Sequence, residues 1–198
     1  MITQGYATLN ELKAATRIAD NVDDSLLEMA IESASRAIDS YTNRNFYSSG
    51  TATRYYAPQN SYICETDDII SLSSLTTLDA DDNYTVTWAA KDYQLEPLNG
   101  FVDGFSVPYT RIRAIDDYVF ETLGGQATVK VVGVFGYATA VPMSIKQATI
   151  IQASRIYKRL DSPLGVAGFG DMGVMRVSSK LDPDVAQLVD SFRRIRMA

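Results

Sequence analysis

The spacing of apolar residues changes twice along this chain of 198 residues, and that pattern limits its fold more than any other feature. In residues 1–48 and 140–198 apolar side chains recur every three or four positions, which is typical of helices. Residues 49–139 instead hold short β-branched and aromatic runs between turn-forming residues. We therefore expect an α+β protein, with a small helical core of three to four helices built from both ends and a β-rich, sandwich- or barrel-like insertion.

Two helices are predicted before the insertion. The first should span residues 9–15, because Thr8 and Glu11 form a capping box. The second should begin after Val22, where acidic residues suit a helix start, and end near Asn43. Its apolar residues share one face: Leu27, Ala30, Ile31, Ala34, Ile38 and Tyr41. Its polar residues fall largely on the other side: Glu28, Glu32, Ser35 and Asp39.

Six to eight short strands are expected in the insertion, because its apolar runs alternate with turn residues. The runs are residues 53–56, 62–64, 69–72, 84–88, 93–95, 110–113 and 127–132. Turn residues at 79–83 and 98–100 separate some of them.

A third helix is predicted from Pro142 to about Leu160, since proline suits the first turn of a helix. Its apolar residues lie on more than one side: Ile145, Ala148, Ile150, Ile151, Ala153, Ile156, Tyr157 and Leu160. A helix apolar around much of its circumference is covered on most sides. We expect a neighbouring subunit to supply part of that cover.

A glycine-rich loop is expected at residues 161–180, and it is too apolar for a linker that only stays solvated. The last helix should open with Asp182 as its cap and Pro183 at its first position. Its apolar stripe continues to Ile195, and arginines at 193, 194 and 196 suit the negative end of a helix.

The residue types present exclude several kinds of chemistry. Histidine is absent and Cys64 is the only cysteine. Ser-His-Asp and Cys-His nucleophile systems are therefore excluded, as is an internal disulfide. We expect no catalytic residue, no metal site and no cofactor.

Other candidate sites favour structural interpretations. Residues 79–83 begin like a calcium loop, but Tyr84 and Ala90 stand where glycine and glutamate are needed. The glycines between 165 and 173 lack the Gly-Lys-Ser/Thr of a phosphate-binding loop. Carboxylates that could serve glycoside hydrolysis show no placement across a cleft: Glu65, Asp67, Asp68, Asp116 and Asp117. Aromatic residues that could stack on sugars or bases are better explained as core residues and cross-strand pairs of a small β-structure: Tyr55, Tyr56, Tyr62, Tyr84, Trp88, Tyr93, Phe101, Phe105 and Tyr109.

Charge is unevenly spread. Residues 1–140 carry 9 basic and 19 acidic residues, a net charge of −10, whereas residues 141–198 carry 9 and 5, a net charge of +4. This is either scatter over a solvated surface or a polarised subunit whose basic end meets an acidic partner. In both interpretations the overall charge of −6 argues against tight binding to DNA phosphates.

No apolar run approaches the roughly 18 residues of a membrane helix. The first residues do not form a secretory signal. We therefore expect a protein without a membrane partner, made and used in a cytoplasm.

Several segments, taken in order, resemble a known family. They are residues 6–12, 26–27, 34–46, 132–137, 141–142, 147–148, 152–155, 159–165 and 181–185. Their order and spacing resemble the head–tail connector proteins of long-tailed bacteriophages, also called adaptor or head-completion proteins. The similarity is strongest in the two helical parts and weakest from residue 48 to 117.

The resemblance implies a structural protein and no enzymatic activity. Such proteins form a ring, typically of twelve subunits, beneath the portal protein in the neck of the virion, after assembly in the host cytoplasm. The ring extends the channel, lets DNA pass without specific binding, and offers a docking surface to the next connector or tail protein.

The resemblance also implies contact residues. Family members commonly engage the portal with their C-terminal segment, which corresponds here to Phe192, Arg193, Arg194 and Arg196. The glycine-rich loop would contact a neighbouring subunit through its apolar residues: Leu164, Val166, Phe169, Met172 and Val174.

Three alternatives stay open. A head–tail stopper or tail-terminator protein would be β-dominated throughout, which the four expected helices argue against. A ligand-binding β module on a helical scaffold would use the aromatic residues to bind sugar. A hydrolase without histidine would need a carboxylate such as Asp67 or Asp116.

Overall fold

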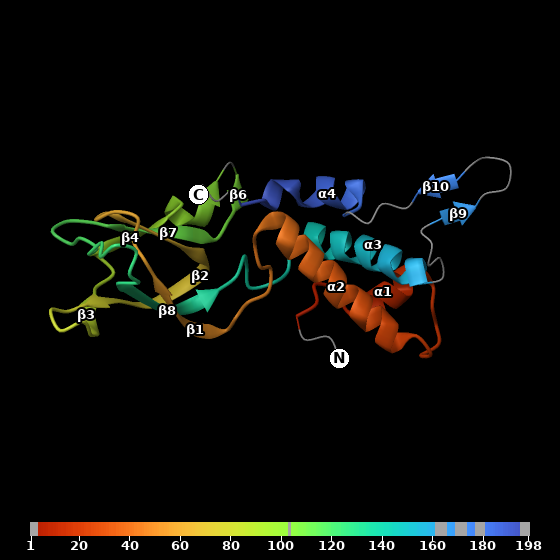
Figure 1. Ribbon diagram of the computed structural model, residues 1–198, viewed down its shortest axis with the longest axis horizontal. Helices are drawn as coiled ribbons and strands as arrows, with labels where there is room; N and C mark the ends of the chain where they lie inside the picture. The colour runs from red at the N-terminus through yellow and green to blue at the C-terminus, as the bar shows by residue number, and fades with distance from the viewer. Residues whose placement is uncertain (1–3, 103, 161–165, 169–173, 177–180, 195–198) are drawn as a thin grey trace. The chain divides into compact units, whose positions relative to one another are not determined.

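The computed structural model describes residues 4–102, 104–160, 166–168, 174–176 and 181–194. The chain divides into two compact units (Figure 1). A helical unit takes residues 1–46 and 141–198, and a β unit takes residues 47–140. The fold is therefore α+β, with the strand-rich segment between two helical ones.

In the described part of the helical unit the α-helices are α1 (Leu9–Thr16), α2 (Asp24–Thr42), α3 (Met143–Leu160) and α4 (Pro183–Val189). The first three confirm the predicted helices to within two residues at each end. The capping box of α1 is also confirmed: the Glu11 N–H donates to the Thr8 hydroxyl at 3.2 Å, and the Thr8 N–H donates to the Glu11 carboxylate at 2.8 Å.

The core of the helical unit lies between α1, α2 and α3. The predicted apolar face of α2 is buried along most of its length: Leu27, Ala30, Ile31, Ala34 and Ile38. Leu12 of α1 and Ala153 of α3 complete the buried cluster. Burying each large aliphatic side chain stabilises the unit by about 1.5–3 kcal/mol.

Part of the apolar surface of α3 is covered within this chain, and the expectation that a neighbouring subunit covers the rest stays a prediction. Ile145, Ala148 and Ala153 are buried within this chain. The other apolar residues named for this helix whose side chains are described are half-buried: Ile150, Ile151, Ile156 and Tyr157. The reason is that α1, α2 and α4 all pack against α3. Met143, at its first turn, is 78% exposed.

The last helix is shorter than predicted. It ends at Val189 and a 3-10 turn, η3 (Asp190–Phe192), follows; Arg193 is in extended conformation. The expectation that Arg193 and Arg194 end a helix is therefore wrong. Tertiary hydrogen bonds replace the helical ones, because the Arg194 N–H donates to the Thr42 carbonyl at 2.8 Å and the Arg44 side chain donates to the Phe192 carbonyl at 2.7 Å.

The β unit is built on one six-stranded antiparallel sheet. Its strands are β1 (Thr51–Tyr56), β2 (Ile63–Leu78), β3 (Tyr84–Trp88), β4 (Tyr93–Glu96), β7 (Tyr109–Ala114) and β8 (Val129–Phe135). The order is β1-β8-β2-β7-β4, and β3 pairs with β2.

The segment predicted as two strands, residues 62–64 and 69–72, is one 16-residue strand, β2. Non-local pairing holds it together, because β7 pairs with its first half and β8 with its second. β-bulges interrupt the register between Ile69 and Ser71 and between Leu72 and Ser74. Opposite the bulges lies Gly133, where a side-chain carbon would collide with the Ser71 carbonyl oxygen.

The core of the β unit is aromatic and aliphatic. The Trp88 ring stacks on Phe120 with centroids 4.7 Å apart, and its indole N–H donates to the Thr77 hydroxyl at 3.0 Å. The buried cluster also holds Cys64, Ile69, Leu75, Ile112, Ala114, Val129, Val131 and Phe135. A stacked, hydrogen-bonded indole is a fixed part of the core.

Smaller elements complete the described chain. The 3-10 turn η1 (Leu98–Gly100) leads into a hairpin of β5 (Phe101–Val102) and β6 (Phe105–Ser106). In the helical unit, β9 (Val166–Gly168) pairs with β10 (Val174–Arg176), inside the segment predicted as a loop. None of the described helices is long and apolar enough to span a bilayer.

Candidate interaction surfaces

The described residues contain no group of three or more histidine, cysteine or carboxylate residues placed to hold a metal ion. Cys64 is fully buried, and that burial raises the pKa of its thiol to about 12. The thiol therefore stays protonated near neutral pH and is a poor nucleophile.

The candidate carboxylates differ in their surroundings. Asp67 accepts a hydrogen bond from Arg54 at 2.7 Å, and the Arg54 guanidinium lies 4.2 Å from the centre of the Phe135 ring. Asp68 is buried, whereas Glu65, Asp116 and Asp117 are exposed. The structure thus pairs Asp67 with a cation of β1.

The acidic segment at residues 79–83 is a turn, as predicted. One Asp79 carboxylate oxygen accepts the N–H groups of Asp81 and Asn83, both at 2.9 Å. The other accepts the Thr85 hydroxyl. The Thr85 hydrogen bond, followed by the bond from the Asn83 N–H, lowers the pKa of Asp79. The Asp79 carboxylate therefore stabilises the turn between β2 and β3 through these hydrogen bonds.

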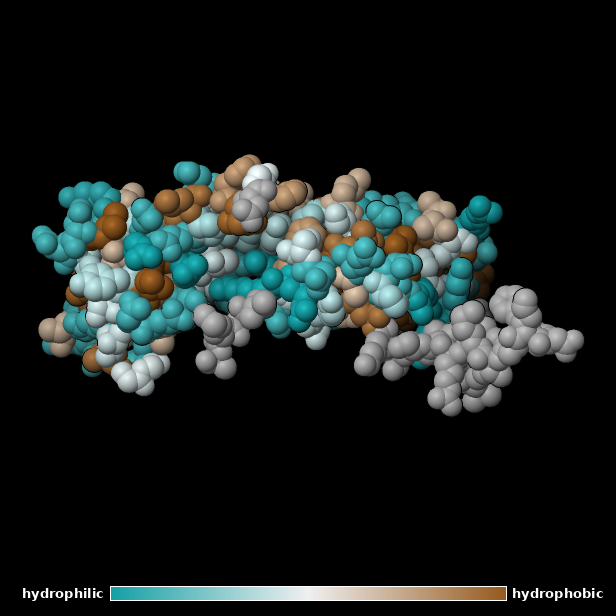
Figure 2. All heavy atoms as spheres, turned by 90° about the horizontal axis from the view of Figure 1, so that it is seen from above, coloured by the Kyte–Doolittle hydropathy of each residue, from teal (hydrophilic) through white to brown (hydrophobic). Residues whose placement is uncertain are grey.

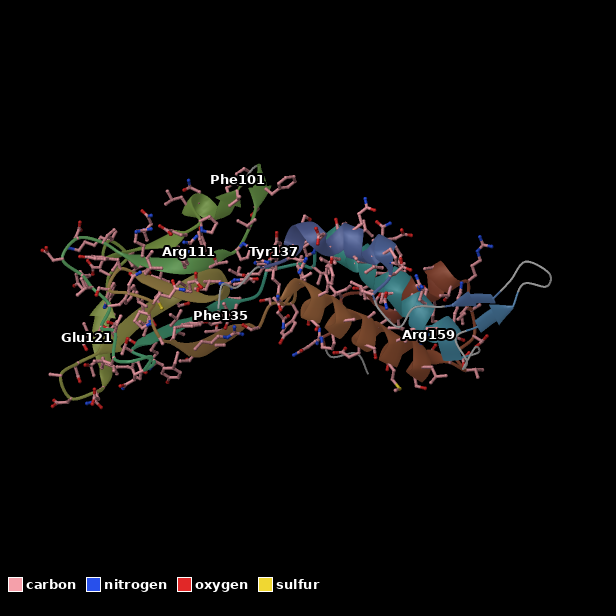
Figure 3. The ribbon with its side chains drawn as sticks, turned by 45° about the horizontal axis from the view of Figure 1, so that its top comes forward. Phe101, Arg111, Glu121, Phe135, Tyr137 and Arg159 are labelled. Atoms are coloured by element: carbon pink, nitrogen blue, oxygen red, sulfur yellow. The ribbon has the colours of Figure 1, made fainter. Side chains whose placement is uncertain are left out.

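The aromatic residues separate into two groups. Trp88 is buried, and Tyr56, Tyr84, Tyr93 and Tyr109 are half-buried. Tyr55, Tyr62, Phe101 and Phe105 are exposed. These four are therefore not core residues, although the Tyr55 ring on β1 lies 5.1 Å from the Tyr84 ring on β3, as a pair between strands. Phe101, labelled in Figure 3, and Phe105 belong to the β5–β6 hairpin.

The predicted portal-binding segment packs partly on its own unit. The Phe192 ring meets Phe46 edge-on with centroids 5.6 Å apart. The Arg193 guanidinium lies 5.0 Å from the centre of the Tyr41 ring and 3.6 Å from the Asp190 carboxylate. Arg193 remains exposed and Arg194 is half-buried, and Arg196 lies outside the described residues.

The predicted subunit-interface loop is described only in part. The backbones of Val166 and Val174 belong to β9 and β10. The positions of Leu164, Phe169 and Met172 lie outside the described residues, as do the side chains of both valines.

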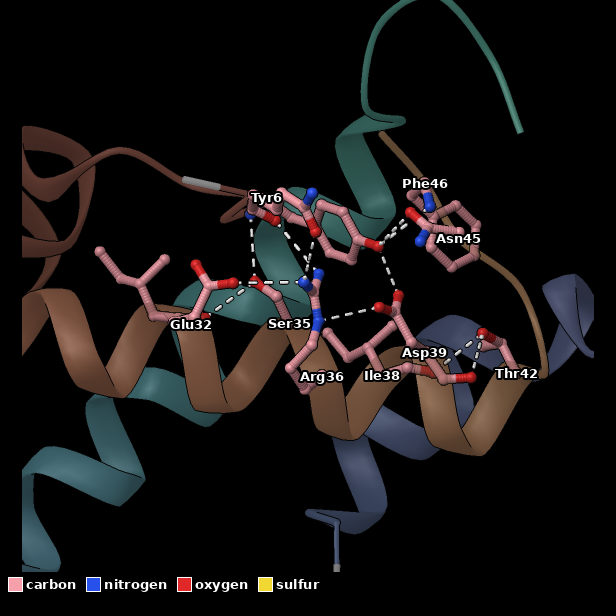
Figure 4. A network of polar contacts seen from close by, with 11 residues as sticks. Tyr6, Glu32, Ser35, Arg36, Ile38, Asp39, Thr42, Asn45 and Phe46 are labelled. Atoms are coloured by element: carbon pink, nitrogen blue, oxygen red, sulfur yellow. Dashed lines mark hydrogen bonds and ion pairs between the residues drawn. The ribbon is translucent and has the colours of Figure 1, made fainter. Parts of the chain in front are cut away.

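A polar network around Tyr6 was not foreseen (Figure 4). The Tyr6 hydroxyl donates to the Asp39 carboxylate, and the Tyr6 N–H donates to the Ser35 hydroxyl at 3.1 Å. Arg36 binds Asp39 at 3.0 Å and covers the Tyr6 ring. Burial raises the pKa of both Tyr6 and Asp39. Ser35 and Asp39 thus anchor the segment before α1, and the polar side of α2 is not simply solvated.

Exposed apolar groups occur on both units, in separate patches between polar ones (Figure 2). One set lies around the start of α2: Val22, just before the helix, is 84% exposed, and Met29, within it, is 66% exposed. The other is the β5–β6 hairpin, where Phe105 is 73% exposed. The described residues thus combine a helical core, an inserted β unit and exposed apolar patches, and such patches are typical of surfaces that contact other chains.

Comparison with known proteins shows which family the chain resembles. A family model for phage gp6-like head-tail connector proteins matches residues 6–73. No curated protein matches the sequence. The resemblance to head–tail connector proteins is confirmed by the family match.

Solved structures match along nearly the whole chain. The neck of an empty GTA particle with C6 symmetry matches with a TM-score of 0.60 at 18% identity, covering 98% of this chain and 92% of that one. The neck of a native GTA particle with C12 symmetry gives 0.54 at 19%, covering 100% and 97%. The virion of a native gene transfer agent (GTA) particle gives 0.58 at 16%, covering 100% and 94%. At this identity the matches show a shared fold.

Proposed function

We propose that this chain is a structural subunit of the neck of a phage-like particle, where copies of it form a ring between the portal and the tail or next connector. The observation that carries the proposal is the family match over residues 6–73 together with neck structures that share the fold of almost the whole chain. The C6 and C12 symmetry of those necks supports a ring, and twelve copies fit the second.

The charges of the chain suit this role. The β unit carries 5 basic and 12 acidic residues, a net charge of −7. DNA phosphates are repelled by such a unit, so DNA that passes it is not held. Portal contacts are assigned to the segment from Phe192 to Arg196, which belongs to the basic part of the chain. The exposed Arg193 is the described cation best placed for an acidic partner.

The stopper or terminator alternative is less well supported, because the helical unit supplies about half of this chain. The sugar-binding alternative loses its main argument, since the exposed aromatic residues do not form one platform with Trp88.

Imaging of the intact neck of the particle that encodes this chain tests the proposal. Density that fits both units in a cyclic ring next to the portal is the expected result. Finding another protein in that layer, with this chain absent, would exclude the proposal. Replacing Arg193 by glutamate should reduce binding to the isolated portal, whereas replacing Lys91, exposed on the β unit, should not.

A further inference from the structure

The β5–β6 hairpin and the turn before it carry a dense apolar patch. Leu98 is 58% exposed, Phe101 56%, Val102 43% and Phe105 73%. Between Pro97 and Thr110 the only charged residue is Asp103. An apolar patch with a single charged residue, on a unit rich in carboxylates, is typical of an interaction surface.

The aromatic residues of this hairpin do not belong to the buried core of the β unit. The buried cluster of the β unit contains Trp88, Phe120 and Phe135 and no residue between Leu98 and Phe105. The sheet is therefore complete without them. Four large apolar side chains are in contact with water, and an interface would remove them from it, which is favourable.

The hairpin is held in a fixed position. The Val107 N–H donates to the Gly100 carbonyl at 2.8 Å. Gly100 is buried with φ of +60°, and a side-chain carbon there would lie 3.1 Å from the Val107 carbonyl oxygen and 3.6 Å from the Tyr109 ring. Only glycine fits both the backbone angle and the space. A fixed hairpin loses little conformational entropy when it binds.

Apolar groups occupy both faces of the hairpin. Val102 and Phe105 are paired across the two strands, so their side chains lie on one face. Phe101 is adjacent to Val102 in the strand and so lies on the other face. Figure 3 shows Phe101 at the margin of the β unit. Such a hairpin suits insertion between two surfaces better than contact with one flat surface.

We infer that the β5–β6 hairpin inserts into the adjacent copy of this chain in the ring. The inference rests on the proposed function, because a cyclic ring needs two different, complementary surfaces on each subunit. Charge favours a second copy as the occupant. Identical β units of charge −7 repel each other, so they approach closely only where charges are few. A basic partner would gain more from the carboxylate-rich faces than from this hairpin.

Photo-crosslinking in the assembled particle tests the inference. Benzoylphenylalanine at position 105 replaces an exposed phenylalanine with a similar side chain, so folding should be retained. Illumination should give an adduct of twice the 21.8 kDa chain mass, with both peptides from this chain. The same residue at position 98 gives a second chance if the first variant fails to assemble. Val86, 40% exposed on β3, is the control position and should give at least tenfold less self-adduct.

The outcomes separate the two proposals. Wild-type chain missing from the neck would remove the proposed function and the inference together. Chain present in the neck, but with positions 98 and 105 crosslinked to a different protein or to nothing, would overturn the inference alone. Equal self-adduct from position 86 would do the same.

Discussion

The hydroxyl of Tyr6 accepts a hydrogen bond from the backbone N–H of Phe46 at 3.0 Å, across 40 residues of sequence. Tyr6 precedes α1, and Phe46 is the last residue of the helical unit before the chain enters the β unit. The two rings also pack edge-on with centroids 5.7 Å apart. One side chain thus ties the start of the chain to the segment that leads into the insertion.

Replacing Tyr6 by phenylalanine should destabilise the helical unit by about 1–3 kcal/mol, because a buried N–H and the Asp39 carboxylate each lose a partner. The ring packing is retained, so the loss measures the hydroxyl alone. Urea unfolding followed by far-UV circular dichroism gives the free energy.

Tyr62→Phe is the matched control, because Tyr62 is 56% exposed on the β unit. It should change the free energy of unfolding by less than about 0.5 kcal/mol. Equal effects of the two substitutions would show that the Tyr6 network contributes nothing specific.

The elements that could be predicted are those specified by nearby residues. The start of α1 follows from Thr8 and Glu11, three positions apart, and α2 follows from its own periodic spacing. The end of α4 could not be predicted, because Arg44 satisfies the Phe192 carbonyl from 148 residues earlier. The length of β2 likewise depends on β7 and β8, which follow it in sequence.

Replacing Glu11 by glutamine should weaken the acid sensitivity of the helical unit. The hydrogen bond from Lys146, followed by that from the Thr8 N–H, lowers the pKa of Glu11. A carboxylate whose pKa is lower in the folded state stabilises it above the unfolded pKa, and that stability is lost as pH falls through the folded pKa.

The wild type should therefore lose stability more steeply than Glu11→Gln as pH falls through and below the ordinary glutamate range. The difference should stay under about 1 kcal/mol, because the pair is one-third exposed. Denaturant unfolding at a series of pH values measures it. Parallel curves for the two proteins would contradict the assignment.

Replacing Gly133 by alanine should destabilise the β unit by about 3 kcal/mol, because the new methyl group meets the Ser71 carbonyl and not a movable side chain. Fluorescence of Trp88, the single tryptophan, reports this unit. Gly50→Ala is the control: its methyl group has open space, so only the φ of +66° is penalised, by about 1 kcal/mol. A Gly133→Ala protein as stable as Gly50→Ala would rule out the close approach at the bulge.

Less of the candidate site than of the fold could be predicted. The sequence predicts a turn at residues 98–100 and core or cross-strand roles for Phe101 and Phe105, because composition does not show which aromatic residues the sheet can enclose. One feature of the sequence does indicate an exposed apolar surface there. From Pro97 to Thr110 the sequence has aromatic residues and a single charged residue, although the surrounding insertion is acidic. The network of Asp39 and Ser35 had no such signal, since its partner Tyr6 lies outside α2.

Asp182 joins α4 to α3, and its replacement should loosen the C-terminal segment. Its carboxylate accepts the Asp184 N–H at 2.8 Å as the cap of α4 and forms an ion pair with Arg155 of α3. Asp182→Ala removes both contacts, and we expect a local loss of about 2 kcal/mol. Asp182→Asn keeps a capping oxygen, so its loss should be smaller.

Hydrogen exchange of the α4 amides, followed by mass spectrometry, measures this local stability. Exchange should be fastest in Asp182→Ala, intermediate in Asp182→Asn, and unchanged in Gln187→Ala, whose side chain is exposed on the same helix. Because Phe192 and Arg193 follow α4 directly, faster exchange should be accompanied by weaker portal binding. Asp182→Ala with wild-type exchange would show that α4 is held by Val185 and Val189 alone, both of which are buried.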